Sequence, residues 1–462
     1  MINVERETAE KWQGSIAAVA WLRAILHERF GLPLELRVDR ASSWVLTLPN
    51  AGDDRAVIID LKPAATQSGG IQQRVFSWDA AREGWHSALD KPLPAPGVCP
   101  IPFPLIEKRG NDYAIRYDIL GLVYWSLTRL EEIDRTDLDE HRRFPAMASH
   151  AFQHGYLERP VVDEWLDILG QVVRRTWPGV ELKRHRFSMR ISHDVDSPSR
   201  YGFCSGRAFL RAAAADFIKY RDVRVVAAPW VRFNTRARLH PLDAFNTFDW
   251  LMEVSERHGL TSAFYFICDR RATAHDSDYD VEHPAIRDLM RRIHARGHEI
   301  GLHPSYNTFL EPAQIKLEAD RLRDVCSQEG IHQEQWGGRM HYLQWRQPVT
   351  LRAWNDAGMT YDSTMGYADR VGFRCGTCFE FPAFDPVRQE ALQLRVRPLV
   401  VMEGTAFGHK YMGLGITDAA RNKMLELKQI CRKVEGSFTL LWHNSSLQTD
   451  MQRYMYEAVV NA

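Results

Sequence analysis

The sequence predicts an α/β fold in which a mostly parallel sheet or barrel follows a smaller α+β region. From about residue 187 onward, short apolar runs alternate with amphipathic helical segments, and several of those segments end directly before a glycine. Before that point the pattern is less regular, and Pro178-Gly179 ends a helical segment. We therefore expect a domain boundary near Lys183, with residues 1–183 and 184–462 as the two domains.

Residues 1–183 show helical and strand patterns but no strong chemical motif. The spacing of apolar residues predicts helices over 12–30, 119–133 and 161–177, and short β-like runs predict strands over 44–48 and 56–59. Prolines recur between Lys91 and Pro104, which excludes a helix and predicts an extended, polyproline-like crossing. The role of this region does not follow from its sequence.

The second region is expected to alternate strands with helices. The strands are predicted over 187–191, 261–267, 298–302, 338–343, 359–362, 396–402 and 437–442, and the helices over 241–258, 284–296, 312–329, 348–357 and 417–434. In such folds the working residues lie where strands end and loops begin. A basic stretch, residues 202–240, interrupts the alternation. We interpret it as a solvated face, with a lid that binds an anionic group as the alternative.

The composition indicates a globular protein with a sizeable core. The chain has 462 residues, of which 45% are hydrophobic and 26% charged, and 59 Lys+Arg residues balance 59 Asp+Glu residues. No net field therefore recruits nucleic acid or an anionic membrane, and no apolar run is long enough to span a bilayer. Seven cysteines without the spacing of a disulfide framework, and an acidic, polar start, predict a cytoplasmic protein with reduced thiols.

Two carboxylates, Asp194 and Asp196, follow the first strand of the second region. If the strand continues through them, their side chains point to the same side. Two close acids repel each other unless a cation or a shared proton lies between them, which suits one acid for holding a metal and the other for moving a proton. Taken alone, such a pair is more often a solvated strand end, here before the turn Ser197-Pro198-Ser199.

Four further strand ends carry residues that bind metals or move protons. They are His303, the pair Arg339 and His341, Asp362, and His443. A lone histidine at a strand end is more often structural than a ligand. Strand ends that together carry Asp, His, Arg, Asp and His within one α/β region nevertheless predict a common site.

With these motifs in the same order, residues 187–444 resemble the polysaccharide deacetylase family, the NodB-homology carbohydrate esterases. The resemblance implies a distorted (β/α) barrel and a divalent metal, with zinc as the expected ion. It also implies Asp194 as catalytic base, Asp196 and His303 as metal ligands, Arg339 as the residue that orients the base, and His443 as general acid. The whole chain resembles a cytoplasmic, two-domain branch of this family seen among bacterial surface-polysaccharide genes.

Two positions depart from the family pattern. Asn307 stands where the family has its second metal histidine, four residues after His303. An Asn carbonyl is a neutral oxygen donor, and zinc prefers imidazole, so zinc affinity should fall. His341 stands where the family usually has proline. We hypothesise that His341 or a water replaces the lost ligand, so that Asp196, His303, Asn307 and His341 are the candidate metal-site residues.

Tyr342, Asp362 and Trp345 are the predicted substrate-binding residues. Asp362 suits either a sugar hydroxyl or a cap, and core packing competes with sugar binding as the use of the tryptophan. Cys375 and Cys378 have C-x-x-C spacing but no second pair to complete a zinc ribbon. We therefore expect neither metal nor redox chemistry at these cysteines.

The sequence thus predicts a metal-dependent hydrolase that removes N-acetyl or related acyl groups from a sugar or glycoconjugate precursor, cleaving a carbon–nitrogen bond. A catalytically silent domain that binds carbohydrate or a biosynthetic partner is the alternative, with Asn307 as its signature. Asp194 and His443 favour the enzyme, because a binding module needs neither a proton acceptor nor a proton donor. A glycosyltransferase is disfavoured, since no glycine-rich loop for a nucleotide accompanies the two acids. No nucleic-acid partner is expected, and the oligomeric state is left open.

Overall fold

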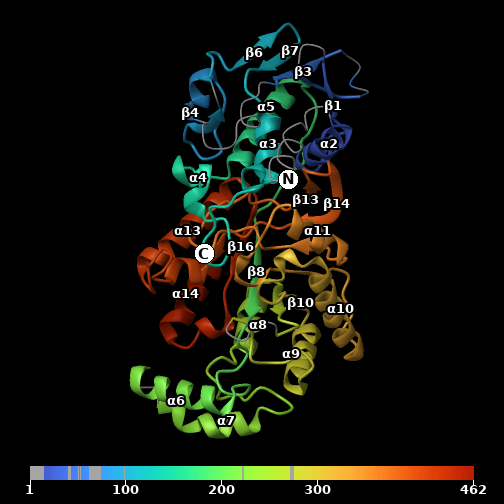
Figure 1. Ribbon diagram of the computed structural model, residues 1–462. Coiled ribbons are helices and arrows are strands. Elements are labelled where there is room, and N and C mark those ends of the chain that lie inside the picture. The colour runs from blue at the N-terminus through green and yellow to red at the C-terminus, as the bar shows by residue number, and fades with distance from the viewer. Residues whose placement is uncertain are drawn as a thin grey trace.

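The computed structural model describes residues 15–39, 43–49, 51, 54–61, 74–97, 99–220, 223–270 and 275–461. Figure 1 shows a small sheet at one end of the molecule, a larger sheet in the middle and two helices at the other end. The strands are β1 Glu35–Val38, β2 Ser43–Thr47, β3 Ala56–Asp60, β4 Arg74–Trp78, β5 Leu93–Gly97, β6 Ile106–Arg109, β7 Asp112–Ile115, β8 Ser188–Val195, β9 Ser262–Phe266, β10 Glu299–Leu302, β11 Gly337–Gly338, β12 Tyr361–Asp362, β13 Phe381–Asp385, β14 Glu390–Val396, β15 Val401–Met402 and β16 Ser437–Leu441. The helices are α2 Ile16–Phe30, α3 Ile119–Leu127, α4 His150–Gln153, α5 Val161–Thr176, α6 Gly206–Tyr220, α7 Ala228–Asn234, α8 Phe248–Arg257, α9 Pro284–Ala295, α10 Pro312–Gln328, α11 Val349–Asp356, α12 Glu403–Phe407, α13 Asp418–Lys433 and α14 Asp450–Asn461.

The small sheet has the strand order β1-β2-β3-β7-β6, and only β3 and β7 run parallel. Helix α2 begins at the cap Ser15, whose side chain accepts a hydrogen bond from the Ala18 N–H, and ends at Gly31, where φ is 70°. Helix α5 buries its apolar stripe and contacts β3, β5 and β7. The crossing expected between Lys91 and Pro104 is extended over residues 93–97, where it forms strand β5 and pairs with β4 instead of a polyproline-like segment. Proline has no N–H to donate to a partner strand. Prolines two residues apart in a strand face the same side, so both can lie where the backbone nitrogen points away from β4.

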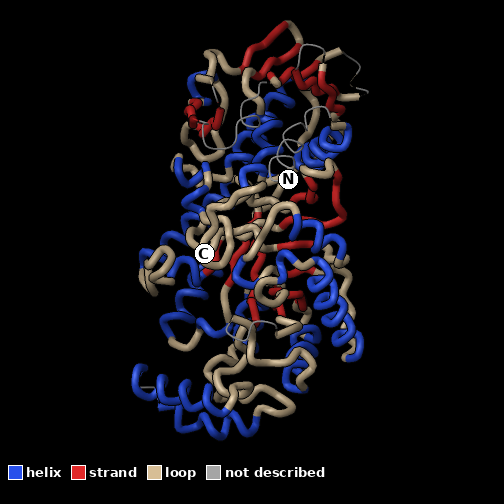
Figure 2. Tube along the Cα trace, viewed as in Figure 1, coloured by secondary structure: helices blue, strands red, loops and turns tan. Residues whose placement is uncertain are grey.

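The large sheet has nine strands in the order β13-β14-β12-β11-β10-β9-β8-β16-β15. Every neighbouring pair is parallel except β13 and β14. Figure 2 shows these strands in the middle of the molecule with helices around them. Within the described residues β13 and β15 are edge strands, so a closed barrel, as the resemblance implied, is not confirmed.

Several elements differ from the expected ones for local reasons. The helix expected over 241–258 begins only at Phe248, because Asp243 accepts hydrogen bonds from nearby backbone N–H groups and holds a turn. The strand expected over 338–343 is limited to Gly337–Gly338 and is followed by a tight turn. The hairpin β13–β14 and the C-terminal helix α14 were not anticipated.

The two sheets share one hydrophobic core. A continuous cluster of buried apolar residues runs from α2 and the small sheet into the large sheet and its helices. At the junction, the Trp21 side chain of α2 donates a hydrogen bond of 2.9 Å to the Pro382 carbonyl and lies 5.2 Å, between ring centroids, from Phe384. Helix α2 is therefore packed directly against the edge hairpin of the large sheet.

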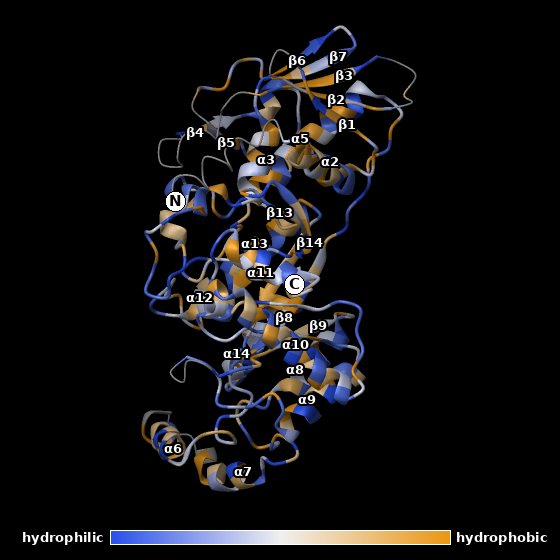
Figure 3. Cartoon of the chain, turned by 45° about the vertical axis from the view of Figure 1, so that its right-hand side comes forward, coloured by the Kyte–Doolittle hydropathy of each residue, from blue (hydrophilic) through white to orange (hydrophobic). Residues whose placement is uncertain are grey.

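Helices α6 and α7 lie apart from this core. In Figures 1 and 3 they form an arm at the end of the molecule opposite the small sheet. Tyr201, Ala228 and Val231 make a small separate apolar cluster there. Within the described part of the chain no helix has the length and apolar content that a bilayer crossing requires.

Candidate active site

The parallel strands of the large sheet bring the predicted site residues to one edge. Asp194 lies near the end of β8 and Asp196 directly follows it, while His303 directly follows β10. Arg339 follows β11, and His443 comes two residues after β16. These four strands lie within five neighbouring positions of the sheet, and their carboxyl ends share one edge.

Asp196, His303 and His341 form a cluster in which one ligand atom from each lies within 4.8 Å of the others. The His303 Nε2 atom is 3.2 Å from Asp196 Oδ1, and the His341 Nε2 atom is 3.6 Å from the same oxygen. Asp196 Oδ1 is buried and has no hydrogen-bond partner within the described residues. An unsatisfied carboxylate oxygen beside two imidazoles fits a divalent cation of the kind that nitrogen and oxygen ligands hold.

Of the two histidines of the cluster, only His303 has a hydrogen-bond partner at its Nδ1 atom within the described residues. His303 Nδ1 lies 2.6 Å from the Arg339 carbonyl oxygen, and His341 Nδ1 lies 3.6 Å from Asp276 Oδ1. Asp276 is itself held in place, since its Oδ1 accepts a 2.7 Å hydrogen bond from the Tyr306 N–H. The hydrogen bond at His303 Nδ1 holds the other ring nitrogen, Nε2, toward Asp196, which is the arrangement that a metal-ligating histidine needs.

Asp194 is held by a fully buried guanidinium. Arg339 donates a 2.7 Å hydrogen bond to Asp194 Oδ1, and further hydrogen bonds to the Ser192 hydroxyl and to the hydroxyl and carbonyl oxygens of Ser363. Asp194 Oδ2 faces His303 Nε2 at 3.7 Å. The carboxylate therefore keeps one oxygen on the Arg339 side and turns the other toward the metal cluster.

His443 faces the cluster from the opposite side and is paired with Glu403. The His443 Nδ1 atom is 2.7 Å from Glu403 Oε1, and its Nε2 atom is 3.5 Å from Asp196 Oδ2. Burial lowers the pKa of His443, but Glu403, with smaller contributions from Asp196 and Asp194, raises it to about 10. His443 is therefore protonated at neutral pH in this structure.

The same contacts shift the pKa values of Asp196 and His303. Burial opposes the charged form of Asp196, yet His341, His303 and His443 hold the pKa of this carboxyl well below its ordinary value. Burial also lowers the pKa of His303, and Asp194 and Asp196 raise it above its ordinary value. The carboxylates and imidazoles of the site thus stabilise each other's charged forms despite their burial.

Asn307 has partners other than the predicted metal. Its side-chain Oδ1 atom accepts hydrogen bonds of 2.7 Å from Arg142 and 3.2 Å from Gln344. Its backbone lies in the left-handed region, with φ at 70°. The cluster that offers three ligand atoms includes His341, whereas the Asn307 Oδ1 atom is directed to Arg142 and Gln344.

The three predicted substrate-binding residues lie in different surroundings. Tyr342 lines the same cavity as the metal cluster. Asp362 is fully buried and accepts hydrogen bonds from the N–H and hydroxyl of Thr364, and burial raises its pKa to about 7. Trp345 is buried and donates its N–H to Gln347. Neither Asp362 nor Trp345 lines the cavity.

The cavity over the cluster has a volume of about 380 Å³, which falls within the range of small-molecule sites. It is lined by Arg143, Asp194, Asp196, Ser197, His275, Asp276, His303, His341, Tyr342, Leu343, Met402, Gly404, Tyr411 and His443. Three carboxylates, four imidazoles and two tyrosines make the lining polar and partly aromatic. An aromatic surface beside hydrogen-bonding groups suits a sugar ring.

Arg143 is contributed by the first 183 residues. It belongs to the 139–143 loop, in which Asp139 accepts hydrogen bonds from the Arg143 side chain and backbone. From this loop, Arg143 donates a 2.9 Å hydrogen bond to the Tyr342 carbonyl, and His141 Nδ1 lies 2.9 Å from the Tyr306 hydroxyl. The 139–143 loop thus contacts both loops that carry the histidines of the cluster.

Sequence reasoning did not identify Glu403, Asp276 or the 139–143 loop. Glu403 could have been found, because it directly follows an expected strand, where the other site residues also lie. Asp276 lies in a long acidic loop and the 139–143 loop lies far away in the chain, so no periodicity or spacing signals either one. Their place in the site depends on the tertiary fold.

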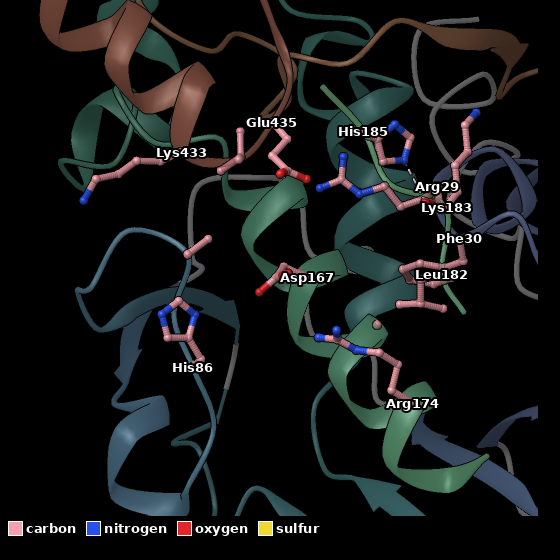
Figure 4. Close-up of a pocket in the computed structure, with 13 residues that line it drawn as sticks. Arg29, Phe30, His86, Asp167, Arg174, Leu182, Lys183, His185, Lys433 and Glu435 are labelled. Carbon is pink, nitrogen blue, oxygen red and sulfur yellow. Dashed lines mark hydrogen bonds between the residues drawn. The ribbon is translucent and has the colours of Figure 1, made fainter. Parts of the chain in front are cut away.

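A second cavity, of about 240 Å³, lies beside the segments that lead into β8 and β16 (Figure 4). It is lined by Arg29, Phe30, His86, Ala88, Asp167, Gly170, Arg174, Leu182, Lys183, His185, Lys433, Val434 and Glu435. In Figure 4 the cationic side chains come from different elements around the opening. None of the predicted site residues lines this cavity, and it lies at the opposite ends of the parallel strands.

Comparison with known proteins gives distant matches. A family of unknown function, DUF7033, matches residues 22–178. No curated protein matches the chain. The solved structures similar to it include a putative polysaccharide deacetylase from Mycobacterium smegmatis (TM-score 0.38, 14% identity, 60% of this chain and 84% of that chain), the Puue allantoinase (0.36, 12%, 62% and 85%) and a probable polysaccharide deacetylase from Pseudomonas aeruginosa PAO1 (0.34, 14%, 60% and 84%).

Proposed function

We propose that this chain is a metal-dependent hydrolase that removes an N-acetyl or related acyl group from a sugar or glycoconjugate precursor. The observation that carries the proposal is the cluster of Asp196, His303 and His341, which faces Asp194 and His443 across one cavity. A binding site for carbohydrate alone has no use for a cation site flanked by a paired acid and base.

Asp196, His303 and His341 would hold the metal, for which zinc is the expected ion, because two imidazoles and one carboxylate form a common catalytic zinc set. The bound ion would polarise the acyl carbonyl and lower the pKa of a water molecule. The hydrogen bond between His303 Nδ1 and the Arg339 carbonyl supports this assignment. In this proposal Asn307 is not a ligand and holds the 139–143 loop.

Asp194 would act as the general base. It takes a proton from the attacking water, while the contact with Arg339 keeps the carboxylate in position and balances its charge. His443 would act as the general acid. Held protonated by Glu403, it gives its Nε2 proton to the departing amine nitrogen, so that the carbon–nitrogen bond breaks and the free amine and carboxylate leave.

The test is release of carboxylate by the purified full-length protein. The zinc-loaded protein is incubated with N-acetylated nucleotide sugars and with lipid-linked N-acetylated oligosaccharides, and acetate is measured. Asp194→Asn and His443→Ala variants should bind zinc but release acetate at least roughly 100-fold more slowly. If neither substrate class releases acetate with zinc, cobalt or manganese added, while a sugar still binds, the silent carbohydrate-binding alternative replaces the enzyme.

A further inference from the structure

The arm formed by α6 and α7, together with the residues that follow it as far as Leu242, exposes an unusual number of large apolar side chains. Seven of the sixteen large hydrophobic residues that are exposed in the described chain lie between residues 210 and 242. They are Leu210, Phe217, Ile218, Val226, Trp230, Phe233 and Leu242, each at least 62% exposed. Apolar residues gathered in this way mark an interaction site more often than scattered ones do.

The exposed residues of α6 form one stripe. The i, i+4, i+7, i+8 spacing places side chains on one helix face. Four exposed residues of α6 have this spacing: Leu210, Ala214, Phe217 and Ile218. The opposite face packs inward, where Phe209 and Ala212 join a small apolar cluster. Helix α6 therefore has one apolar side that packs inward and a second apolar stripe that is exposed. Figure 3 shows the arm at one end of the molecule.

The same arm is strongly basic. Residues 206–238 contain eight Lys and Arg residues and two Asp residues, although the whole chain is neutral. Arg207 and Arg211 are exposed beside the α6 stripe. The acid Asp216 is directed inward and accepts hydrogen bonds from Arg200 and Tyr201. The outer surface of the arm thus combines cationic groups with aromatic and aliphatic groups.

We propose that this arm docks the protein on an anionic lipid bilayer, with α6 and α7 lying in the headgroup region. An amphipathic helix with basic residues beside Trp, Phe and Leu binds such a surface by burying its apolar stripe and attracting anionic headgroups. A second copy of the chain fits less well, because pairing two such arms would place like charges together.

The arm has a defined relation to the candidate site but does not depend on its chemistry. Helix α6 begins at Gly206, ten residues after Asp196, so the arm leaves the large sheet at the same edge that carries the cluster. A bilayer contacted by α6 and α7 would lie on this side of the molecule. The proposal would stand for any activity of the cavity.

Vesicle flotation of the full-length protein tests the proposal. Vesicles of phosphatidylcholine alone are compared with vesicles in which one lipid in four is phosphatidylglycerol. The wild-type protein should float with the anionic vesicles and remain free with the neutral ones. The double variants Phe217→Ser/Ile218→Ser and Arg207→Gln/Arg211→Gln should each lower the partition coefficient by roughly tenfold or more.

The control is Leu317→Ser, which removes an exposed leucine of α10 (55% exposed) and should bind like the wild type. Thermal unfolding is measured for every variant. Each should keep the wild-type melting temperature, because the changed side chains are exposed. The proposal is overturned if the wild type stays free of anionic vesicles, if it binds neutral vesicles equally well, or if the arm variants bind unchanged. It is also overturned if light scattering shows a dimer that Phe217→Ser/Ile218→Ser dissociates and that does not bind lipid.

Discussion

Arg142 donates a 2.7 Å hydrogen bond to the side-chain oxygen of Asn307, and so joins the 139–143 loop to the loop that carries His303. The same side-chain oxygen accepts from Gln344, which in turn donates to the His141 carbonyl. The residue at the position expected for a metal histidine therefore ties three chain segments together.

This junction is a place of backbone strain. Nine residues other than glycine have positive φ in the described chain. Four of them lie at this junction, namely Arg142, Asn307, Tyr342 and Leu343. Left-handed backbone costs roughly 1 kcal/mol or more for such residues, so that contacts must hold it. The turn through Tyr342 and Leu343 directly follows His341, and Arg143 holds it through the Tyr342 carbonyl. We infer that the 139–143 loop positions His341 for the metal cluster.

The first prediction concerns this positioning. Arg142→Gln removes the bond to Asn307 at an exposed site, and it should weaken zinc binding by roughly tenfold, as loss of a supporting contact often does. Isothermal titration calorimetry on the full-length protein measures the affinity. Hydrogen exchange of the metal-free variant should also be faster in peptides that span residues 303–310 and 340–346.

A matched control breaks another contact between the first 183 residues and the later chain. Glu158→Gln removes the 2.8 Å ion pair with Lys423 and touches neither loop of the cluster. Its zinc affinity and hydrogen exchange in the two peptides should equal those of the wild type. Equal values for Arg142→Gln would show that the bond between Arg142 and Asn307 does not position His341.

The second prediction concerns the pairing of His443 with Glu403. Glu403→Gln removes the negative charge that keeps His443 protonated, so kcat should fall by roughly 10- to 100-fold, less than for His443→Ala. Zinc affinity should change little, because neither residue belongs to the metal cluster. Steady-state acetate release with parallel calorimetry separates the two effects. A variant that loses zinc but keeps kcat when saturated with metal would contradict the assigned role.

The third prediction concerns the pH dependence of stability. Glu318 of α10 accepts hydrogen bonds from the N–H and hydroxyl of Ser305, and burial raises its pKa to about 7. A raised pKa in the folded state stabilises the fold fully below about pH 4.5, and this contribution is lost as the pH rises through about 7.

Glu318→Gln has no such titration. The free energy of unfolding of this variant, relative to the wild type, should therefore rise between pH 5 and pH 8, by roughly 1–3 kcal/mol. Urea unfolding at several pH values measures the difference, with the exposed Glu181→Gln as a control. A difference that stays constant with pH, or that falls, would contradict the buried ionisation of Glu318.

Much of the site follows from the sequence because parallel strands impose a simple geometry. Five of the predicted site residues lie at a strand end or within two residues after it, and a parallel sheet places those ends on one edge. They are Asp194, Asp196, His303, Arg339 and His443. The alternation of strands and helices was therefore enough to predict that these residues meet. Their roles in catalysis stay predictions until activity is measured.

The remaining features depend on contacts that a linear pattern does not contain. His341 reaches Asp196 through a left-handed turn at Tyr342, where an extended strand was expected. The role of Asn307 depends on Arg142, which is 165 residues away in the chain. The apolar spacing of α6 suggests a buried face, and only the fold shows that its stripe at Leu210, Phe217 and Ile218 is exposed.

The central claim is that Asp196, His303 and His341 together hold one divalent metal ion. Calorimetric titration of zinc into the metal-free wild type and into His341→Ala tests it most directly. The account predicts one zinc ion per wild-type chain and an affinity at least roughly 100-fold weaker in the variant, which loses one of three protein ligands. A wild-type chain that binds no zinc, or a His341→Ala chain that binds it as tightly as the wild type, would contradict the account.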